Sequence, residues 1–167
     1  DRLRTLATST LPDMARRLWS PEFRAAFQNV VREVRPDVVQ VEGIELARYI
    51  TEYGASPALP RVVFDDHNCE HLLQRRAFLS DVRRPKRWHG AAYSFVQSLR
   101  LRTFERRILE CANDALCVSE QDRVMLQALA PRADVHVVSN GIDVADYEVG
   151  APVDGATLVF TGKMDFR

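Results

Sequence analysis

A histidine directly follows an apolar segment and two acidic residues. The segment is Val62–Phe64, and it continues into Asp65, Asp66, His67 and Asn68. Histidine changes charge near neutral pH, so it can donate a hydrogen bond or carry a proton to a reacting group. We therefore predict that His67 is catalytic and that Asp66 and Asn68 bind substrate beside it. The alternative interpretation is a structural histidine that anchors the turn.

Three further apolar segments also end in small or polar residues. The residues that follow them, which we predict to bind substrate, are Glu42, Gly43, Ser119, Glu120, Asn140 and Gly141. Ligands of open parallel sheets bind beyond the carboxyl ends of the strands, so four such ends at one edge predict a cleft. The alternative is that these residue types end strands simply as turns and caps.

Two of these residues, Asn68 and Ser119, are also predicted to be helix N-caps. A cap side chain accepts a hydrogen bond from the first turn of its helix, and this role alone explains both residues. A helix N-terminus that faces a cleft also attracts a phosphate or a sugar hydroxyl.

A metal centre is not expected. His67 and His71 are four residues apart, with Asp65 and Glu70 nearby. This spacing alone is weak evidence, because no Glu follows the first histidine and nothing requires Cys69 to point inward.

Strand-like and helix-like segments alternate along the chain and must position these residues. Strands are predicted over 37–42, 61–66, 115–118, 135–138 and 157–161. Helices are predicted between Ser20 and Pro36, over 45–53, 69–79 and 88–111, and from Ser119 onward, with Ser20 as the N-cap of the first. This order predicts an α/β fold, a Rossmann-like parallel sheet with helices on both faces. Gly-x-Gly-x-x-Gly and Walker patterns are absent, so the first part of such a domain is expected to be missing.

The longest predicted helix carries two apolar stripes. The first consists of Trp88, Ala92, Phe95 and Leu99, and the second of Leu101, Phe104 and Ile108. The second stripe begins only two residues after the first ends, instead of the three or four that would keep both on one helix face. We therefore expect this helix to be buried over a broad arc or to bend.

Composition limits the class of protein. The chain has 167 residues, of which 46% are hydrophobic and 28% charged, which suits one globular domain and excludes global disorder. The three cysteines form no Cys-x-x-Cys pair, and an odd count predicts reduced thiols in the cytoplasm. No secretory signal is recognised, and no apolar run reaches the roughly 18 residues that span a bilayer.

Charge is distributed unevenly although the formal net charge is zero. Residues 83–107 contain eight Arg or Lys and one acid, Glu105, for a net charge of +7. The simplest interpretation is a solvated helix face. The alternative is peripheral contact with an anionic membrane, at its inner face, or with an anionic lipid acceptor. Nucleic acid is not an expected partner, because no compact binding motif accompanies the charge.

Five short motifs occur in order along the chain. They are Val-Gln-Val-Glu-Gly (39–43), Phe-Asp-Asp-His-Asn-Cys-Glu (64–70), Val-Ser-Glu (118–120), Val-Val-Ser-Asn-Gly-Ile-Asp (137–143) and Phe-Thr-Gly-Lys-Met-Asp (160–165). Together they resemble glycosyltransferases of the GT-B fold, group 1, also called family 4. The bacterial branch linked to exopolysaccharide synthesis is the most similar. The resemblance covers residues 37–167.

The resemblance implies a division into domains. Residues 1–145 would be the latter part of an N-terminal acceptor-binding Rossmann-like domain, and 146–155 a linker. Residues 156–167 would be the first strand of a C-terminal domain that binds a nucleotide-diphosphate sugar. Such enzymes transfer the sugar to a glycan or lipid-linked acceptor with retention of anomeric configuration, and they use no cofactor and usually no metal.

The resemblance also assigns roles to residues. His67 matches the histidine beside the transferred sugar, Gly162 and Lys163 match the pair that approaches the donor diphosphate, and Glu120 lines the cleft. The Gly-rich first loop and the donor-side Glu-x7-Glu segment of the family are missing. We therefore expect this chain to be inactive alone, and its last strand to allow a strand-swapped homodimer.

Two other functions remain as alternatives. One is a non-catalytic Rossmann-like or flavodoxin-like module that binds a ligand. The other is a hydrolase that uses His67 with Asp65 or Asp66, although no Gly-x-Ser-x-Gly nucleophile motif supports it.

Overall fold

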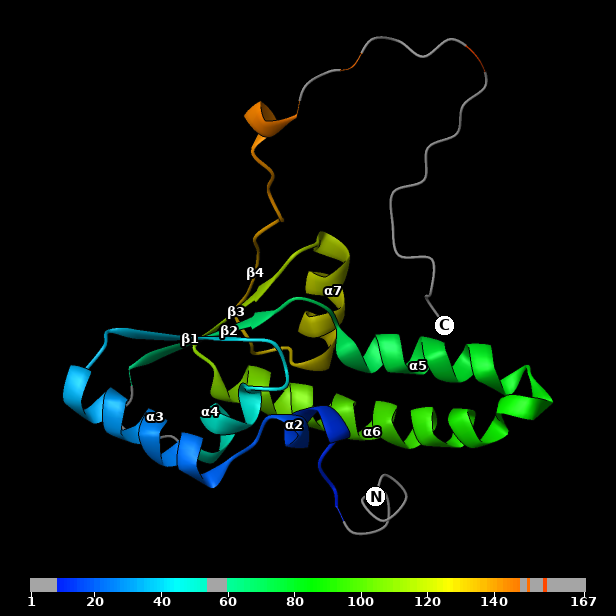
Figure 1. The fold of residues 1–167 in the computed structure, drawn as a ribbon, viewed down its shortest axis with the longest axis horizontal. Helices are drawn as coiled ribbons and strands as arrows, with labels where there is room; N and C mark the ends of the chain where they lie inside the picture. The colour runs from blue at the N-terminus through cyan, green and yellow to red at the C-terminus, as the bar shows by residue number, and fades with distance from the viewer. Residues whose placement is uncertain (1–8, 54–59, 148–149, 151–154, 156–167) are drawn as a thin grey trace.

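The computed structural model describes residues 9–53, 60–147, 150 and 155. Its centre is a parallel sheet of four strands in the order β1-β2-β3-β4 (Figure 1). The strands are β1 (Val38–Glu42), β2 (Arg61–Asp66), β3 (Asp114–Cys117) and β4 (Val135–Val137). The predicted α/β fold with a Rossmann-like parallel sheet is thereby confirmed. The strand predicted over 157–161 lies outside the described residues.

The helices agree closely with the predicted segments. They are α3 (Pro21–Val34), α4 (Ala47–Tyr53), α5 (Glu70–Val82), α6 (Trp88–Cys111) and α7 (Glu120–Leu129). Three short elements were not predicted: helix α2 (Asp13–Arg17) and the 3-10 turns η1 (Pro85–Arg87) and η2 (Val144–Asp146). Among the described residues, no helix is long and apolar enough to cross a membrane.

Two of the three predicted caps are confirmed. The Ser20 hydroxyl accepts a hydrogen bond from the backbone N–H of Phe23, and Ser119 accepts one from Asp122. The prediction for Asn68 is wrong, because α5 begins at Glu70 and its N-cap is Cys69, which makes no side-chain cap bond. Asn68 instead lies exposed in the bend between β2 and α5.

The two faces of the sheet differ in burial. Alternate residues such as Val41, Phe64 and Ala115 are buried, whereas Gln40 and His136, which lie on the opposite face, are exposed. Parallel strands in sequential order, joined by right-handed crossovers, place their connecting helices on the same face. Helices α4 and α7 contact the strands directly. The described residues therefore show the helical layer of one face, and the second layer of the predicted helices on both faces is not seen among them.

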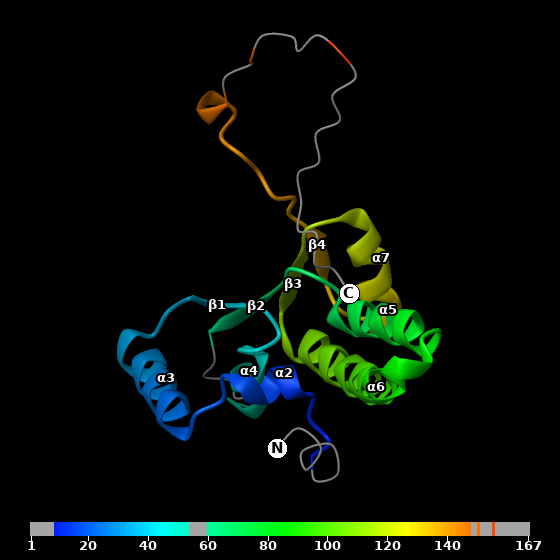
Figure 2. The ribbon, with the colours of Figure 1, turned by 45° about the vertical axis from the view of Figure 1, so that its right-hand side comes forward.

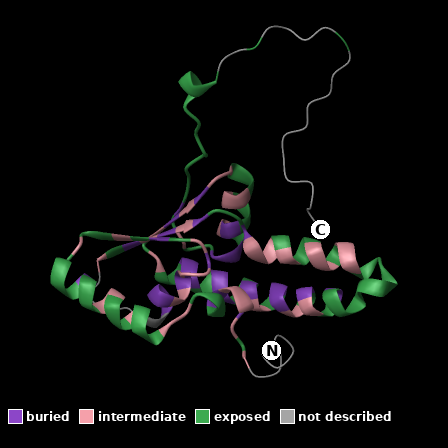
Figure 3. Ribbon diagram, in the orientation of Figure 1, coloured by how far each residue is buried: buried purple, intermediate pink, exposed green. Residues whose placement is uncertain are grey.

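Helix α6 corrects one expectation about its apolar stripes. Leu101, Phe104 and Ile108 are buried in the core, but Trp88, Phe95 and Leu99 are 61%, 46% and 51% exposed. The two-residue step between the stripes marks two different faces of one helix, so the broad buried arc was wrong. Figure 3 shows the buried side of α6. With α5 it forms a hairpin that extends away from the sheet (Figures 1 and 2).

Candidate functional site

The register of the sheet brings the predicted strand ends together. Glu42 pairs with Asp65, and Asp66 pairs with Cys117. The backbone N–H of Gly43 donates to the Asp65 carbonyl at 3.0 Å, and that of Val138 donates to the Cys117 carbonyl at 2.8 Å. The carboxyl ends of all four strands therefore lie along one edge of the sheet. Gly43 turns the chain there with a φ of +76°, which favours glycine.

His67 lies at this edge with its imidazole in contact with solvent. Its side chain is 54% exposed, and its Nε2 atom is 3.7 Å from the Asp65 Oδ1 atom. The Nε2 of Gln40 donates to the other carboxylate oxygen of Asp65 at 3.3 Å. A bound molecule can therefore reach the imidazole.

Asp66, one residue earlier, points to the opposite side and is buried. Its side chain packs under the helical layer, and its Oδ2 atom has no hydrogen-bond partner within the described part of the chain. Burial, followed by the charges of Glu105 and Glu70, raises the pKa of Asp66 well above its usual range. A protonated Asp66 can donate a hydrogen bond, but from inside the molecule rather than from the exposed edge.

Sequence reasoning missed the group that holds this turn in place. Glu105 of α6 is fully buried, and the His71 Nδ1 atom lies 2.5 Å from its Oε2 atom. The backbone N–H of His71 is 3.2 Å from both carboxylate oxygens. These bonds tie the first turn of α5 to α6. One signal was present: Glu105 is the only acid of residues 83–107, and it falls on the apolar stripe of Leu101, Phe104 and Ile108.

The distances among Cys69, His71 and Glu105 fit hydrogen bonds better than shared binding of a metal ion. Cys69 Sγ lies 3.3 Å from His71 Nδ1, so Cys69, His71 and Glu105 bring three potential metal ligands together. Two ligands on one tetrahedral zinc would be separated by roughly 3.3 Å, given bonds of about 2.1 Å. The His71–Glu105 distance is much shorter. Burial and the charge of Glu105 also raise the pKa of the Cys69 thiol, which opposes thiolate ligation.

A second cluster of potential ligands lies at the other end of the sheet. Asp114, Asp134 and His136 lie close together, with Asp134 and His136 exposed. Arg61 engages both carboxylate oxygens of Asp114, at 2.6 and 2.8 Å, and lowers the pKa of that carboxyl. This arrangement is an ion-pair network across β2, β3 and β4.

The remaining predicted residues lie farther along the edge or beyond it. Ser119 caps α7 and donates to the Asp122 carboxylate at 2.5 Å, so its hydroxyl is already engaged. Glu120 is exposed and paired with Arg123, which lowers the pKa of Glu120. Asn140 and Gly141 are exposed in the segment after β4. Gly162 and Lys163 lie outside the described residues.

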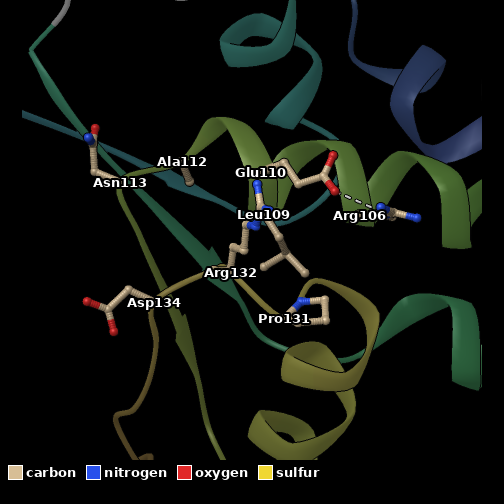
Figure 4. A pocket seen from close by; sticks show the side chains of 9 residues that line it. Arg106, Leu109, Glu110, Ala112, Asn113, Pro131, Arg132 and Asp134 are labelled. Atoms are coloured by element: carbon tan, nitrogen blue, oxygen red, sulfur yellow. Dashed lines mark hydrogen bonds and ion pairs between the residues drawn. The ribbon is translucent and has the colours of Figure 1, made fainter.

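A cavity of about 720 Å³ lies at the amino end of the strands, away from His67. Figure 4 shows it between the end of α6 and the loop before β4, where Arg106 pairs with Glu110 at 2.8 Å. None of the predicted site residues that the structure describes lines it. The geometry therefore separates this cavity from the edge where the predicted residues gather.

Comparisons with known proteins identify the family. Searches of curated proteins and of solved structures found no match. The family model described as glycosyltransferase family 4 matches residues 1–146, which is most of the chain. Together with the parallel sheet, this match shows that the chain belongs to glycosyltransferase family 4.

Proposed function

We propose that this chain is the acceptor-side part of an enzyme that transfers a sugar from a nucleotide diphosphate to a glycan or a lipid-linked acceptor. The supporting observation is His67, an exposed imidazole beside Asp65 at the carboxyl edge of the sheet, in a chain of this family. In the proposed reaction the bond from the sugar to the diphosphate breaks, a bond from the sugar to the acceptor oxygen forms, and the acceptor hydroxyl gives its proton to the departing diphosphate.

The proposed role of His67 is to donate a hydrogen bond to the transferred sugar. Glu42, Gly43 and Asn68 flank it on the same edge and would contact the acceptor. Gly162 and Lys163 would approach the donor diphosphate, where a cation offsets the charge that develops as the nucleotide leaves. We further propose retention of configuration, a role in exopolysaccharide synthesis and a cytoplasmic location. No cofactor takes part in this proposal.

A donor assay tests this function. The full-length protein is incubated with nucleotide-diphosphate sugars, with and without a glycan or polyprenyl-linked acceptor, and release of the nucleoside diphosphate is measured. Release together with a glycoside of unchanged anomeric configuration is the expected result. Binding of a nucleotide sugar without any turnover would favour the non-catalytic binding module instead.

A further inference from the structure

The α5–α6 hairpin exposes apolar side chains along one face. On α6, Trp88, Phe95 and Leu99 are separated by seven and four residues, which places them on one side of the helix. On α5, Leu79 and Val82 are exposed and three residues apart. The Phe78 ring lies 5.2 Å from that of Phe95, so the two helices meet along this face.

Positive charge surrounds this face. Arg83, Arg84 and Lys86 are exposed in the turn between the helices. Arg75 and Arg102 line a hollow of about 330 Å³ between α5 and α6, together with Leu72 and Leu99.

The nearby acids do not cancel this charge. Asp81 pairs with Arg87 at 3.0 Å, and Glu105 is buried against His71. Residues 83–107 therefore present basic side chains to solvent and no exposed acid.

We propose that the hairpin is a docking surface for an anionic lipid bilayer. Its apolar stripe (Trp88, Phe95, Leu99, Leu79 and Val82) would enter the headgroup region, and its basic residues would contact lipid phosphates. Tryptophan favours the membrane–water interface, and an apolar helix face flanked by Lys and Arg is typical of helices that lie in it. Arg75 and Arg102 would hold one lipid phosphate at the hollow.

Charge complementarity favours this occupant over others. A second copy of the chain would bring two segments of net charge +7 together, and they would repel each other. An anionic surface instead attracts each of the exposed basic residues. A polyanion that bound the basic residues would leave the apolar centre of the face exposed to solvent, whereas a bilayer interface would bury it.

The position of the hairpin relative to His67 also suits a lipid-linked acceptor, an argument that rests on the proposed function. Helix α5 begins three residues after His67 and carries the chain roughly 20 Å, at 1.5 Å per residue, to the hairpin turn. Docking of the hairpin would therefore bring the edge that carries His67 close to the bilayer surface.

Vesicle binding tests the proposal without any sugar transfer. Sedimentation is measured with phosphatidylcholine vesicles and with vesicles that contain phosphatidylglycerol as well. We expect binding to the anionic vesicles alone, weakening as salt rises. A Trp19→Phe variant leaves Trp88 as the only tryptophan. Its emission should shift to the blue and become protected from iodide when the protein binds.

Two sets of variants separate charge from apolar contact. Reversal of Arg83, Arg84 and Lys86 to Glu should weaken binding at least about tenfold. A control with the same change in net charge, Arg16→Glu with Arg32→Glu and Arg132→Glu, should bind clearly better than that variant. Phe95→Ser with Leu99→Ser should abolish the protection of Trp88. His67→Ala should bind vesicles like the unchanged protein, which separates docking from the proposed chemistry.

Several results would overturn the proposal. They are equal binding to neutral vesicles, no binding to either kind, or equal loss in the control variant. A Trp88 emission that does not change on binding would exclude insertion of the stripe. A concentration-dependent dimer that Phe95→Ser with Leu99→Ser dissociates would show that a second copy covers this face instead.

Discussion

The Nδ1 atom of His71 lies 2.5 Å from the Oε2 atom of Glu105, which is fully buried in α6. The backbone N–H of His71 also points at this carboxylate. Because α5 begins three residues after His67, the bond fixes the turn that carries the proposed catalytic histidine. Glu105 therefore positions the site without touching its exposed edge.

Replacement of Glu105 by Ala should destabilise the fold by about 3 kcal/mol, because it leaves buried donors of His71 without a partner. The free energy of unfolding in urea measures this effect. Glu110→Ala is the control on the same helix, since its exposed pair with Arg106 contributes about 0.5 kcal/mol. An equal decrease in the free energy of unfolding in the two variants would show that the buried His71–Glu105 bond stabilises the fold no more than the exposed pair does.

Glu70 should make stability depend on pH. Burial and the charges of Glu105 and Glu45 raise its pKa from 4.5 to about 7. The folded state then binds more protons than the unfolded state between these values, so stability falls as pH rises from 4.5 to about 7. Glu70→Gln should therefore be more stable than the unchanged chain at pH 8, by about 1 kcal/mol after allowance for solvent screening, and equal to it near pH 4. Urea unfolding at both pH values measures this, and a difference independent of pH would contradict the assignment.

Gly43 should resist substitution because of its backbone conformation. Its φ of +76° is unfavourable for any residue with a Cβ, although a Cβ there would meet only Glu45 Oε2, at an ordinary distance of 3.4 Å. Gly43→Ala should therefore cost about 1 kcal/mol. Gly141→Ala is the control, because that glycine is exposed and has open space around it. Thermal unfolding of the two variants makes the comparison, and an unchanged midpoint for Gly43→Ala would argue against strain at this turn.

The alternation of segment types was enough to predict the parallel sheet and the order of its elements. Ser20 and Ser119 were predictable as caps because each side chain bonds the helix turn that follows it directly. Asn68 was not, because Cys69 separates it from α5 and the sequence does not define helix ends that closely. Helix α2 has only five residues and shows no apolar period.

The errors at α6 have a common physical origin. Periodicity shows which residues share a face, but it does not show which face the rest of the fold covers. Trp88 and Leu99 are therefore exposed although they form an apolar stripe. Glu105 was missed for the converse reason, because a charged residue is buried only where a partner such as His71 comes from another element. Contacts between distant segments decide both cases.

The proposed role of His67 is best tested by the rate of sugar transfer in the full-length protein carrying His67→Ala. We expect kcat to fall about a hundredfold or more, while the thermal unfolding midpoint stays unchanged because the side chain is half exposed. His89→Ala, an exposed histidine in the first turn of α6, is the matched control and should keep full activity. A kcat for His67→Ala within twofold of the unchanged enzyme would show that His67 has no part in the transfer step.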